Sequence, residues 1–570
     1  MPRFGDDLVA AIESAERWAI HDPDPVSRSK LDTLIDAGDP ALIRLFSGRL
    51  AFGTAGLRAE VGVGPTKMNA LVVRQTTAGV VDWLRRSGIA KPRVVIGFDA
   101  RHDSHAWARH GAAAVHAGGG HPLCATEAAP TPVFAHALLT ERADAAIVVT
   151  ASHNPPADNG YKLYLGDGLQ LTAPADVEIA ERIEALAQSW SSFGTQIDDA
   201  YAEFEFGDPD LTASWIAYHH QSAMSALMTD RRTVSLAYTA MHGVAGPSIM
   251  HTFQSAGFVQ PIVVAEQFEP DGDFPTVPFP NPEETGAMDL VMATARKHRA
   301  DVAVANDPDG DRVAVAVPSR NGDGFTALSG NELGALLGDH VLRHTTGSDR
   351  LVARSVVSSR QLDALAAAAG VHCEVTLTGF KWIARPIVTH APLRFVFGFE
   401  EAIGYCIGER VRDKDGVTAA LVAAEMFAGF RAANSSAWQR LDELAAAHGV
   451  YANRPIVIRF DDDPSRGAKL MAKLEGPLPD ALGGQRIVES GPVGLGSLPP
   501  TPGLHMVTAD DTRVIVRPSG TEPKFKAYIE VIQPVQDHAL VHVEAARERA
   551  ASRLEAVTAD VQALLNPGRG

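Results

Sequence analysis

Apolar residues change their spacing repeatedly along this chain, and the changes predict where helices and strands lie. Residues 8–38 carry apolar side chains at helical spacing and predict a helical lead-in. From residue 71 onward, segments with helical periodicity alternate with short runs of Val, Ile and Ala that are typical of buried strands. Strands that alternate with helices favour a mostly parallel sheet with helices on its faces.

The alternation comes in three successive rounds, and each round ends a strand in a chemically unusual loop. Open α/β sheets tend to bind ligands at that end of their strands, so each loop is a candidate functional site. The expected strand-and-loop segments are 93–101, 145–155, 233–246, 261–266, 301–312, 350–359 and 394–405, and the expected helices are 71–88, 105–119, 246–257, 288–300, 331–344, 360–370 and 417–433.

A fourth region begins near Tyr451 and mixes strand and helix patterns in a different order, which predicts an α+β domain. Inside it, the glycine- and proline-rich stretch 491–505 predicts a surface loop. The expected fold is therefore three similar α/β domains with mixed, mostly parallel sheets, followed by a C-terminal α+β domain. The predicted domains are 1–210, 211–325, 326–450 and 451–570.

Composition narrows the classes of partner and compartment. The formal net charge of -18 disfavours nucleic acid or an anionic membrane as the main partner, because both require a basic surface. The sequence has neither a run of about 20 apolar residues nor a signal-peptide pattern, so no membrane span is expected. Three widely spaced cysteines indicate free thiols in a reducing compartment. We expect a cytoplasmic protein.

The stretch NDPDGDR, residues 306–312, is the most distinctive acidic feature. Asp307, Asp309 and Asp311 alternate through a tight turn, which can bring three carboxylates onto one hard cation such as Mg²⁺. A solvated acidic turn and aspartyl-phosphatase chemistry are the alternatives. An EF-hand is disfavoured because the residues that follow, VAVAV, predict a strand rather than a helix.

The stretch TASHNPPADNGYK, residues 150–162, follows an expected strand and permits three interpretations of Ser152. It could belong to a plain turn, to a hydrolase-like Ser–His pair, or to a loop that carries phosphate on the serine. The hydrolase interpretation is weakened by the missing GxSxG elbow. It is also weakened because adjacent side chains on an extended backbone point to opposite sides, which would keep His153 from deprotonating Ser152.

Two further loops offer groups for anions and hydroxyls. In RPSGTEPKFKAY, residues 517–528, an arginine, two hydroxyls and a glycine could hold a phosphate, although a plain polar turn is an equal alternative. In GFEEAIGY, residues 398–405, paired glutamates could accept hydrogen bonds from sugar hydroxyls or begin a helix. Thr54, Arg58 and Lys381 are weaker candidates.

Taken together, these four loops resemble the α-D-phosphohexomutase family, which includes phosphoglucomutases and phosphomannomutases. TASHNP with NGYK resembles the family's phosphoserine loop, NDPDGDR its Mg²⁺ loop, GFEEAIGY its sugar-binding loop and RPSGTEPK its phosphate-binding loop. They occur in family order, one in each expected domain. FGTAGLR and the long lead-in most resemble the branch of phosphoglucomutase-2-like enzymes and phosphopentomutases.

The resemblance implies four domains around a central cleft and a role for each candidate residue. Ser152 would carry the phosphoryl group and would share Mg²⁺ with Asp307, Asp309 and Asp311, which makes the protein a phosphoprotein. Arg58, His153 and Lys162 would complete the catalytic group. Substrate would be bound by Thr54, Arg312, Lys381, Glu400, Arg517, Ser519, Gly520 and Thr521.

The implied activity is a mutase that interconverts a sugar 1-phosphate and 6-phosphate, of glucose or mannose, through a bisphosphorylated sugar. A sugar bisphosphate of the glucose 1,6-bisphosphate type would serve as activator. The expected partner is a small sugar phosphate, and the enzyme would be a monomer or a homodimer. Many glucose and mannose enzymes carry a serine where this chain has Ala402, which leaves room for a phosphopentomutase. A sugar-phosphate phosphatase and a non-catalytic sensor are further alternatives.

Overall fold

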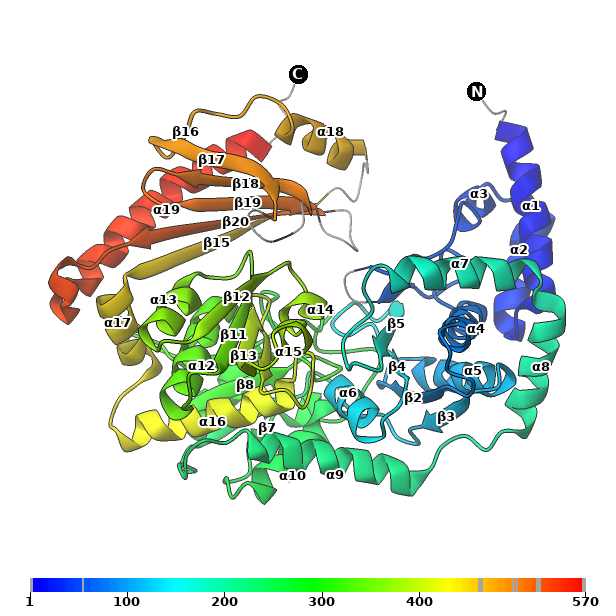
Figure 1. Cartoon of the computed structure of the whole chain (residues 1–570), viewed down its shortest axis with the longest axis horizontal. Helices are drawn as coiled ribbons and strands as arrows, with labels where there is room; N and C mark the ends of the chain where they lie inside the picture. Colours follow the sequence, from blue (N-terminus) through cyan, green and yellow to red (C-terminus); the bar gives the residue numbers. More distant parts are fainter. Residues whose placement is uncertain are drawn as a thin grey trace. The chain divides into compact units, whose positions relative to one another are not determined.

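The computed structural model describes residues 4–53, 56–459, 465–494, 498, 501–518 and 524–565. By its internal contacts the chain divides into two compact units, whose helices and strands are labelled in Figure 1. The first comprises Met1–Leu227, Val234–Ala316 and Gly404–Ala424, and the second comprises Met228–Thr233, Val317–Ile403 and Glu425–Gly570.

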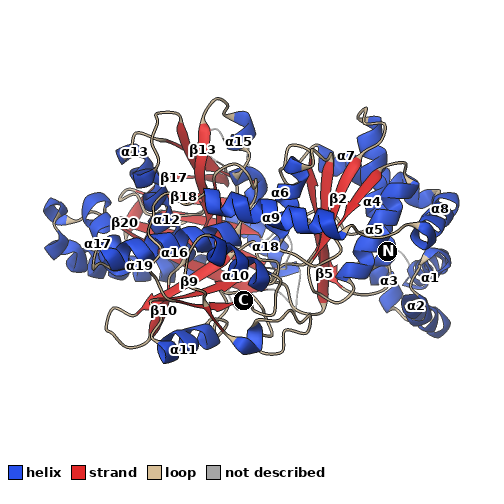
Figure 2. Cartoon of the chain, turned by 90° about the horizontal axis from the view of Figure 1, so that it is seen from below, coloured by secondary structure: helices blue, strands red, loops and turns tan. Residues whose placement is uncertain are grey.

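The first unit begins with helices and then builds a five-stranded sheet of order β1-β5-β4-β2-β3. Strand β2 pairs in parallel with β3 and β4, whereas β5 runs antiparallel to β4 and β1. Helix α5 covers one face of this sheet and α6 the other (Figure 2). The strands are β1 (Leu57–Glu60), β2 (Arg93–Phe98), β3 (His121–Cys124), β4 (Ala145–Val149) and β5 (Asp158–Leu165). The helices are α1 (Phe4–His21), α2 (Pro25–Ala37), α3 (Ala41–Leu45), α4 (Ala70–Arg86), α5 (Ser104–Ala117), α6 (Thr131–Thr140), α7 (Ala175–Gln188), α8 (Trp190–Glu203) and α9 (Pro209–Ser225).

The second sheet repeats this plan. Its order is β10-β9-β8-β6-β7, with β6 parallel to β7 and β8, and β9 antiparallel to β8. In both sheets, the loop with the unusual residues joins a parallel strand to its antiparallel neighbour. The elements are β6 (Leu236–Thr239), α10 (Ala245–Ser255), β7 (Ile262–Val263), η1 (Ala265–Gln267), α11 (Asp289–His298), β8 (Val302–Asn306), β9 (Val313–Pro318) and β10 (Phe325–Ala327).

The third sheet has the order β12-β11-β13-β14, and β11 pairs in parallel with both β12 and β13. Among the described residues, no single helix is both long and apolar enough to cross a membrane, and α16 with α17 meets the test only as a pair bent by 89°. The elements are α12 (Gly330–His344), β11 (Arg350–Ser355), α13 (Gln361–Ala368), β12 (His372–Thr376), α14 (Phe380–Ile383), α15 (Pro386–Thr389), β13 (Arg394–Glu400), β14 (Gly404–Ile407), α16 (Gly416–Ala432) and α17 (Ala437–His448).

The C-terminal sheet is antiparallel wherever its strand pairs are assigned, with the order β15-β20-β19-β18-β17-β16. Apolar side chains of α18 and α19 form one core with side chains of β18, β19 and β20. The elements are β15 (Val450–Arg459), α18 (Ser465–Leu474), β16 (Ala481–Leu482), β17 (Gln485–Val493), β18 (Thr501–Thr508), β19 (Arg513–Pro518), β20 (Lys524–Gln533), η2 (Gln536–His538), η3 (Leu540–His542) and α19 (Val543–Leu565).

The predicted fold class is confirmed: three α/β domains precede an α+β domain. One local prediction was wrong, because the expected surface loop 491–505 contains strand residues at both of its ends. Residues up to Val493 finish β17, and Thr501 already begins β18. Glycine and proline mark this stretch as a loop in the sequence, but pairing with the neighbouring strands overrides that signal.

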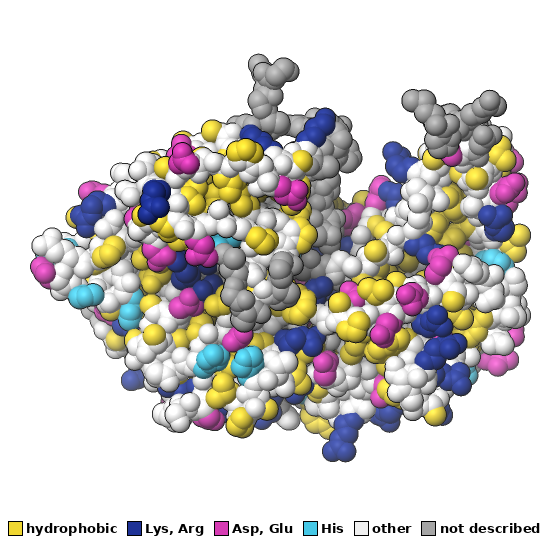
Figure 3. All heavy atoms as spheres, turned by 45° about the horizontal axis from the view of Figure 1, so that its top comes forward, with side chains coloured by type: hydrophobic (Ala, Val, Ile, Leu, Met, Phe, Trp, Pro, Cys, Tyr) yellow, Lys and Arg dark blue, Asp and Glu magenta, His cyan; other side chains and the backbone are white. Residues whose placement is uncertain are grey.

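On the face shown in Figure 3, acidic and basic side chains are interspersed rather than gathered by sign.

Candidate active site

Ser152 lies in the loop between β4 and β5, is 1% exposed, and has a left-handed backbone with φ 53°. A short chain of hydrogen bonds fixes this turn. The Ser152 N–H donates to Thr150 Oγ1 at 2.8 Å, and the Thr150 hydroxyl donates to Asp99 Oδ2 at 2.6 Å. A non-glycine residue in this conformation carries a local energetic cost, and such strain is often kept at functional sites.

The left-handed turn corrects one prediction. Ser152 and His153 were expected to point apart, but Ser152 Oγ lies 3.1 Å from His153 Nδ1. The prediction assumed an extended backbone at the serine, whereas φ 53° turns the two side chains toward each other. Burial, reinforced by the positive charges of Arg312 and Arg58, holds the pKa of His153 well below its usual value. The imidazole is therefore neutral, and it is a weaker base than an ordinary histidine.

Arg101 holds the serine loop and was not predicted from the sequence. Its guanidinium donates to the backbone carbonyls of Ser152, Asn154, Pro155 and Asp158 at 2.5 to 3.1 Å. Because those carbonyls run from Ser152 to the first residue of β5, a single buried side chain fixes the path of the loop between them.

Asp99 holds Arg101 in place through two contacts. Its Oδ2 lies 3.3 Å from Arg101 Nε, and its Oδ1 accepts a hydrogen bond from the backbone N–H of Arg101 at 3.0 Å. Both residues directly follow β2, a neighbour of the serine strand in the sheet. Charged residues just after the strand RVVIGF were the signal that could have found them.

The aspartate loop meets the serine loop directly. Ser152 Oγ donates to Asp307 Oδ2 at 2.9 Å, and the Arg312 N–H donates to Asp307 Oδ1 at 2.9 Å. Lys162 Nζ lies 2.6 Å from Asp309 Oδ2 and 2.6 Å from Asp311 Oδ2. The three predicted aspartates, the serine and the lysine therefore form one buried cluster within the first unit.

The three carboxylates fit a hard divalent cation. Asp307, Asp309 and Asp311 are buried, and each offers an oxygen within 4.8 Å of those of the other two. Asp309 Oδ1 and Asp311 Oδ1 are buried without a hydrogen-bond partner, although buried polar atoms nearly always have one. Burial together with the charges of Asp309 and Asp311 raises the pKa of Asp307 well above its usual value. A cation of the Mg²⁺ type satisfies both observations.

Positively charged side chains lie beside these carboxylates, and Lys162 contacts two of them directly. Burial disfavours the charged form of Lys162, but Asp309 and Asp311 outweigh burial and raise its pKa, so the lysine stays charged. The ammonium of Lys162 lies on these two aspartates, and its action on the transferring phosphoryl group stays a prediction. The Arg58 guanidinium, on β1, donates to Asn154 Oδ1 at 3.3 Å.

Lys414 and Asp413 extend the cluster and were also not predicted. Lys414 Nζ lies 3.4 Å from Asp311 Oδ2 and 3.2 Å from Asp413 Oδ1. Asp413 Oδ2 accepts from Tyr164 OH at 2.6 Å and from Gln170 Nε2 at 2.5 Å. The alternating charges of RDKDG, residues 412–416, just before a strongly apolar helix were the available signal.

The remaining candidates belong to the second unit or lie outside the described residues. Glu400 ends β13 and is buried, whereas Glu401 accepts hydrogen bonds from Ser355 and Ser358. Lys381 lies on α14, and Arg517 on β19. Thr54, Ser519, Gly520 and Thr521 lie outside the described residues. Substrate contacts by these residues stay a prediction.

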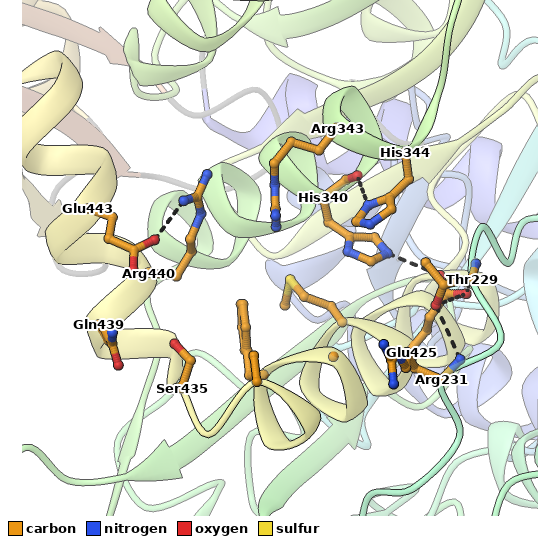
Figure 4. A pocket seen from close by; sticks show the side chains of 14 residues that line it. Thr229, Arg231, His340, Arg343, His344, Glu425, Ser435, Gln439, Arg440 and Glu443 are labelled. Carbon is orange, nitrogen blue, oxygen red and sulfur yellow. Dashed lines mark hydrogen bonds and ion pairs between the residues drawn. The ribbon is translucent and has the colours of Figure 1, made fainter.

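The second unit also contains a cavity of about 420 Å³ between α12, α16 and α17 (Figure 4). Two pairs of charged side chains contact each other in its lining. His340 Nε2 lies 3.0 Å from Glu425 Oε2, and Arg440 Nη1 donates to Glu443 Oε2 at 2.7 Å. None of the residues predicted from the sequence lines this cavity, so it is not the site that the four loops indicate.

Comparisons with known proteins match the first three domains to family models and most of the chain to relatives. Models of phosphoglucomutase/phosphomannomutase α/β/α domains I, II and III match residues 49–190, 216–322 and 329–448. A probable phosphomannomutase of Haemophilus influenzae is 37% identical over 480 residues, covering 81% of this chain and 93% of the relative. A phosphopentomutase of Pongo abelii is 33% identical over 572 residues, covering 93% of each. The crystal structure of a putative phosphomannomutase from Thermus thermophilus has a TM-score of 0.66 at 20% identity, covering 90% of this chain and 99% of that one.

Proposed function

Since the chain belongs to the phosphoglucomutase/phosphomannomutase family, and is thus an isomerase that transfers phosphate intramolecularly, we propose that it interconverts hexose 1-phosphate and 6-phosphate through phosphorylated Ser152. The observation that carries the proposal is the meeting of the serine and aspartate loops. Ser152 Oγ lies 2.9 Å from one carboxylate of a buried triad that fits a divalent cation.

In the forward step, a hydroxyl oxygen of the sugar phosphate forms a bond to phosphorus while the bond from phosphorus to Ser152 Oγ breaks, and the proton of that hydroxyl ends on Ser152 Oγ. The sugar leaves this step with two phosphates. After it reorients, its other phosphate returns to Ser152, and the isomeric monophosphate is released. When the serine hydroxyl is the attacking group, its proton passes to the sugar oxygen that loses the phosphate, and His153, with Nδ1 3.1 Å from Ser152 Oγ, helps to orient the hydroxyl.

Charge neutralisation is the main task of the surrounding side chains, because phosphoryl transfer depends on positioning and electrostatic stabilisation. Lys162 and Lys414 neutralise part of the negative charge of the aspartates. Arg58 donates a hydrogen bond to Asn154 of the serine loop. Mg²⁺ held by Asp307, Asp309 and Asp311 would supply positive charge to the transferring phosphoryl group.

Arg312 and the second-unit residues Lys381, Glu400 and Arg517 are proposed to bind the sugar and its second phosphate. A sugar bisphosphate would prime Ser152 with its first phosphate. Glucose and mannose phosphates are the proposed substrates, and ribose or deoxyribose 1-phosphate is the second candidate. Ala402, which stands where many glucose and mannose enzymes have a serine, leaves room for that second candidate.

The test is Ser152→Ala, assayed for conversion of glucose 1-phosphate to glucose 6-phosphate with a bisphosphate activator. We expect activity to fall by at least about three orders of magnitude, because the phosphate carrier is gone. Ser192→Ala, an exposed serine in α8, is the matched control and should keep full activity. Normal turnover by Ser152→Ala would overturn the assignment.

Substrate preference needs a separate measurement on the wild-type enzyme. Values of kcat/KM for glucose 1-phosphate, mannose 1-phosphate and ribose 1-phosphate, measured side by side, rank the hexose proposal against the pentose one. Inorganic phosphate released in step with substrate loss would instead identify a phosphatase.

A further inference from the structure

A second group of possible metal ligands lies in the second unit. It is distant in sequence from the aspartate triad, and it includes imidazoles as well as a carboxylate. His372 and Glu374 are two residues apart on β12, so their side chains leave the same face of the strand. His390 follows α15 and brings its ring to the same place, with the two imidazole centroids 5.7 Å apart. We call His372, Glu374 and His390 the His–Glu–His cluster.

The two histidines converge on one carboxylate oxygen. Nε2 of His372 lies 3.0 Å from Glu374 Oε2, and Nε2 of His390 lies 3.4 Å from the same atom. One ligand atom from each residue lies within 4.8 Å of the other two. We propose that the His–Glu–His cluster binds a divalent transition metal of the Zn²⁺ class.

The distances suit such an ion. Zn²⁺ binds imidazole nitrogen and carboxylate oxygen at about 2.0–2.2 Å, and tetrahedral geometry then separates neighbouring ligand atoms by roughly 3.4 Å. The two imidazole nitrogens lie 3.0 and 3.4 Å from Glu374 Oε2, close to that value, so these two ligand pairs need little movement. Two imidazoles favour Zn²⁺, Ni²⁺ or Cu²⁺ over Mg²⁺, which prefers an all-oxygen site.

The cluster has two other features of a metal site. His390 Nδ1 lies 3.0 Å from Thr389 Oγ1, so the ring nitrogen that would not bind metal already has a partner that orients the imidazole. The side chains are 47%, 24% and 33% exposed for His372, Glu374 and His390, which lets an ion enter and leaves room for water as a fourth ligand.

Metal binding here would act on a segment with a proposed role. The ligands come from both ends of the chain between β12 and α15, and that chain carries α14 with Lys381. An ion joining Glu374 to His390 closes this stretch into a loop and restricts its conformations. The site is thus a structural clip on a substrate-binding segment, and it does not depend on the identity of the sugar.

The test is calorimetric titration of the full chain with ZnCl₂ in millimolar MgCl₂, which keeps the aspartate triad occupied. We expect one Zn²⁺ per chain that Mg²⁺ does not displace, and an affinity that falls more than about 100-fold in His372→Ala and His390→Ala, since even losing an outer partner of a metal ligand costs about 10–100-fold. The control is His298→Ala, an exposed histidine at the end of α11, which should leave the affinity unchanged.

Glu374→Gln keeps the shape of the side chain and removes the charge, so it guards against a fold defect in the histidine variants. Co²⁺ in place of Zn²⁺ should give the visible absorption of tetrahedral cobalt in the wild type and lose it in Glu374→Gln. The proposal is overturned if no Mg²⁺-resistant site exists. It is equally overturned if Zn²⁺ affinity is the same in the wild type, His372→Ala and His390→Ala, because the cluster would then be only a hydrogen-bonded group.

Discussion

Replacing Arg101 with lysine tests whether one guanidinium holds the phosphate-carrying loop. Arg101 Nη1 donates to the carbonyls of Pro155 and Asp158, and Nη2 donates to those of Ser152 and Asn154. A lysine carries its donors on one nitrogen, so it can satisfy only one of these two pairs. Each lost bond to a charged donor is worth about 1.5–3 kcal/mol, so the productive loop loses about 3–6 kcal/mol.

Because about 1.4 kcal/mol corresponds to a factor of ten, a loss of 3 kcal/mol from the productive conformation lowers kcat/KM by at least about 100-fold. The assay is mutase turnover, accompanied by the phosphate content of Ser152 from intact mass and by the rate of proteolytic nicking in the loop. We expect slower turnover, lower phosphate content and faster nicking.

Arg109→Lys is the matched control. Arg109 is on α5 and places its guanidinium carbon 4.9 Å from the Tyr201 ring centroid, a contact that lysine can also make. We expect it to behave like the wild type. If Arg101→Lys matches Arg109→Lys in kcat/KM and in nicking rate, the four carbonyl bonds do not hold the loop and the reasoning fails.

Two further predictions concern packing and pH. Gly416→Ala would put a Cβ 2.4 Å from the Arg312 carbonyl oxygen in the aspartate loop, so we expect a loss of about 1–3 kcal/mol and weaker Mg²⁺ binding by calorimetry. Gly429→Ala in the same helix meets nothing within 4 Å, and it should stabilise the protein by about 1 kcal/mol; equal effects of the two changes would contradict this. Burial, aided by Arg74, lowers the pKa of His110 from 6.5 to about 3, so the unfolded chain takes up the proton first as pH falls. The contribution of the neutral His110 to the free energy of unfolding is complete above about pH 6.5 and declines by at most about 1.4 kcal/mol per pH unit toward pH 3. In urea unfolding, His110→Gln should lose stability less steeply than the wild type between pH 6.5 and pH 3. The same pH dependence in both proteins would contradict the lowered pKa of His110.

The features of the site that could be predicted from the sequence are those whose residues are neighbours along the chain. The three aspartates lie within one short loop at the end of a buried strand, so their convergence follows from the position of the strand and the local geometry of the turn. The serine loop was found in the same way. The alternation of helices and strands likewise predicted the three α/β sheets, because it reflects which faces are buried.

The contributions of Arg101 and Lys414 were not predictable in this way, because their partners are distant along the chain. Arg101 acts on carbonyls more than fifty residues later, and Lys414 acts on Asp311 a hundred residues earlier. The turn at Ser152 was missed for another reason. Serine rarely adopts a left-handed backbone, so the extended geometry that we assumed was the ordinary expectation. The turn is held instead by hydrogen bonds to the distant residues Asp99 and Arg101.

The left-handed serine also bears on how the phosphorylated form can be imitated. Aspartate tolerates positive φ, so Ser152→Asp would not be rejected by the backbone. Its carboxylate would, however, point at Asp307 Oδ2 from the place of a hydroxyl 2.9 Å away, which adds a fourth acid to a buried triad. We expect such a phosphomimetic to take up a proton or push the loop aside, and therefore to resemble neither state of the enzyme. The permanent charge that serves in many signalling proteins is unsuited to a residue whose charge must come and go.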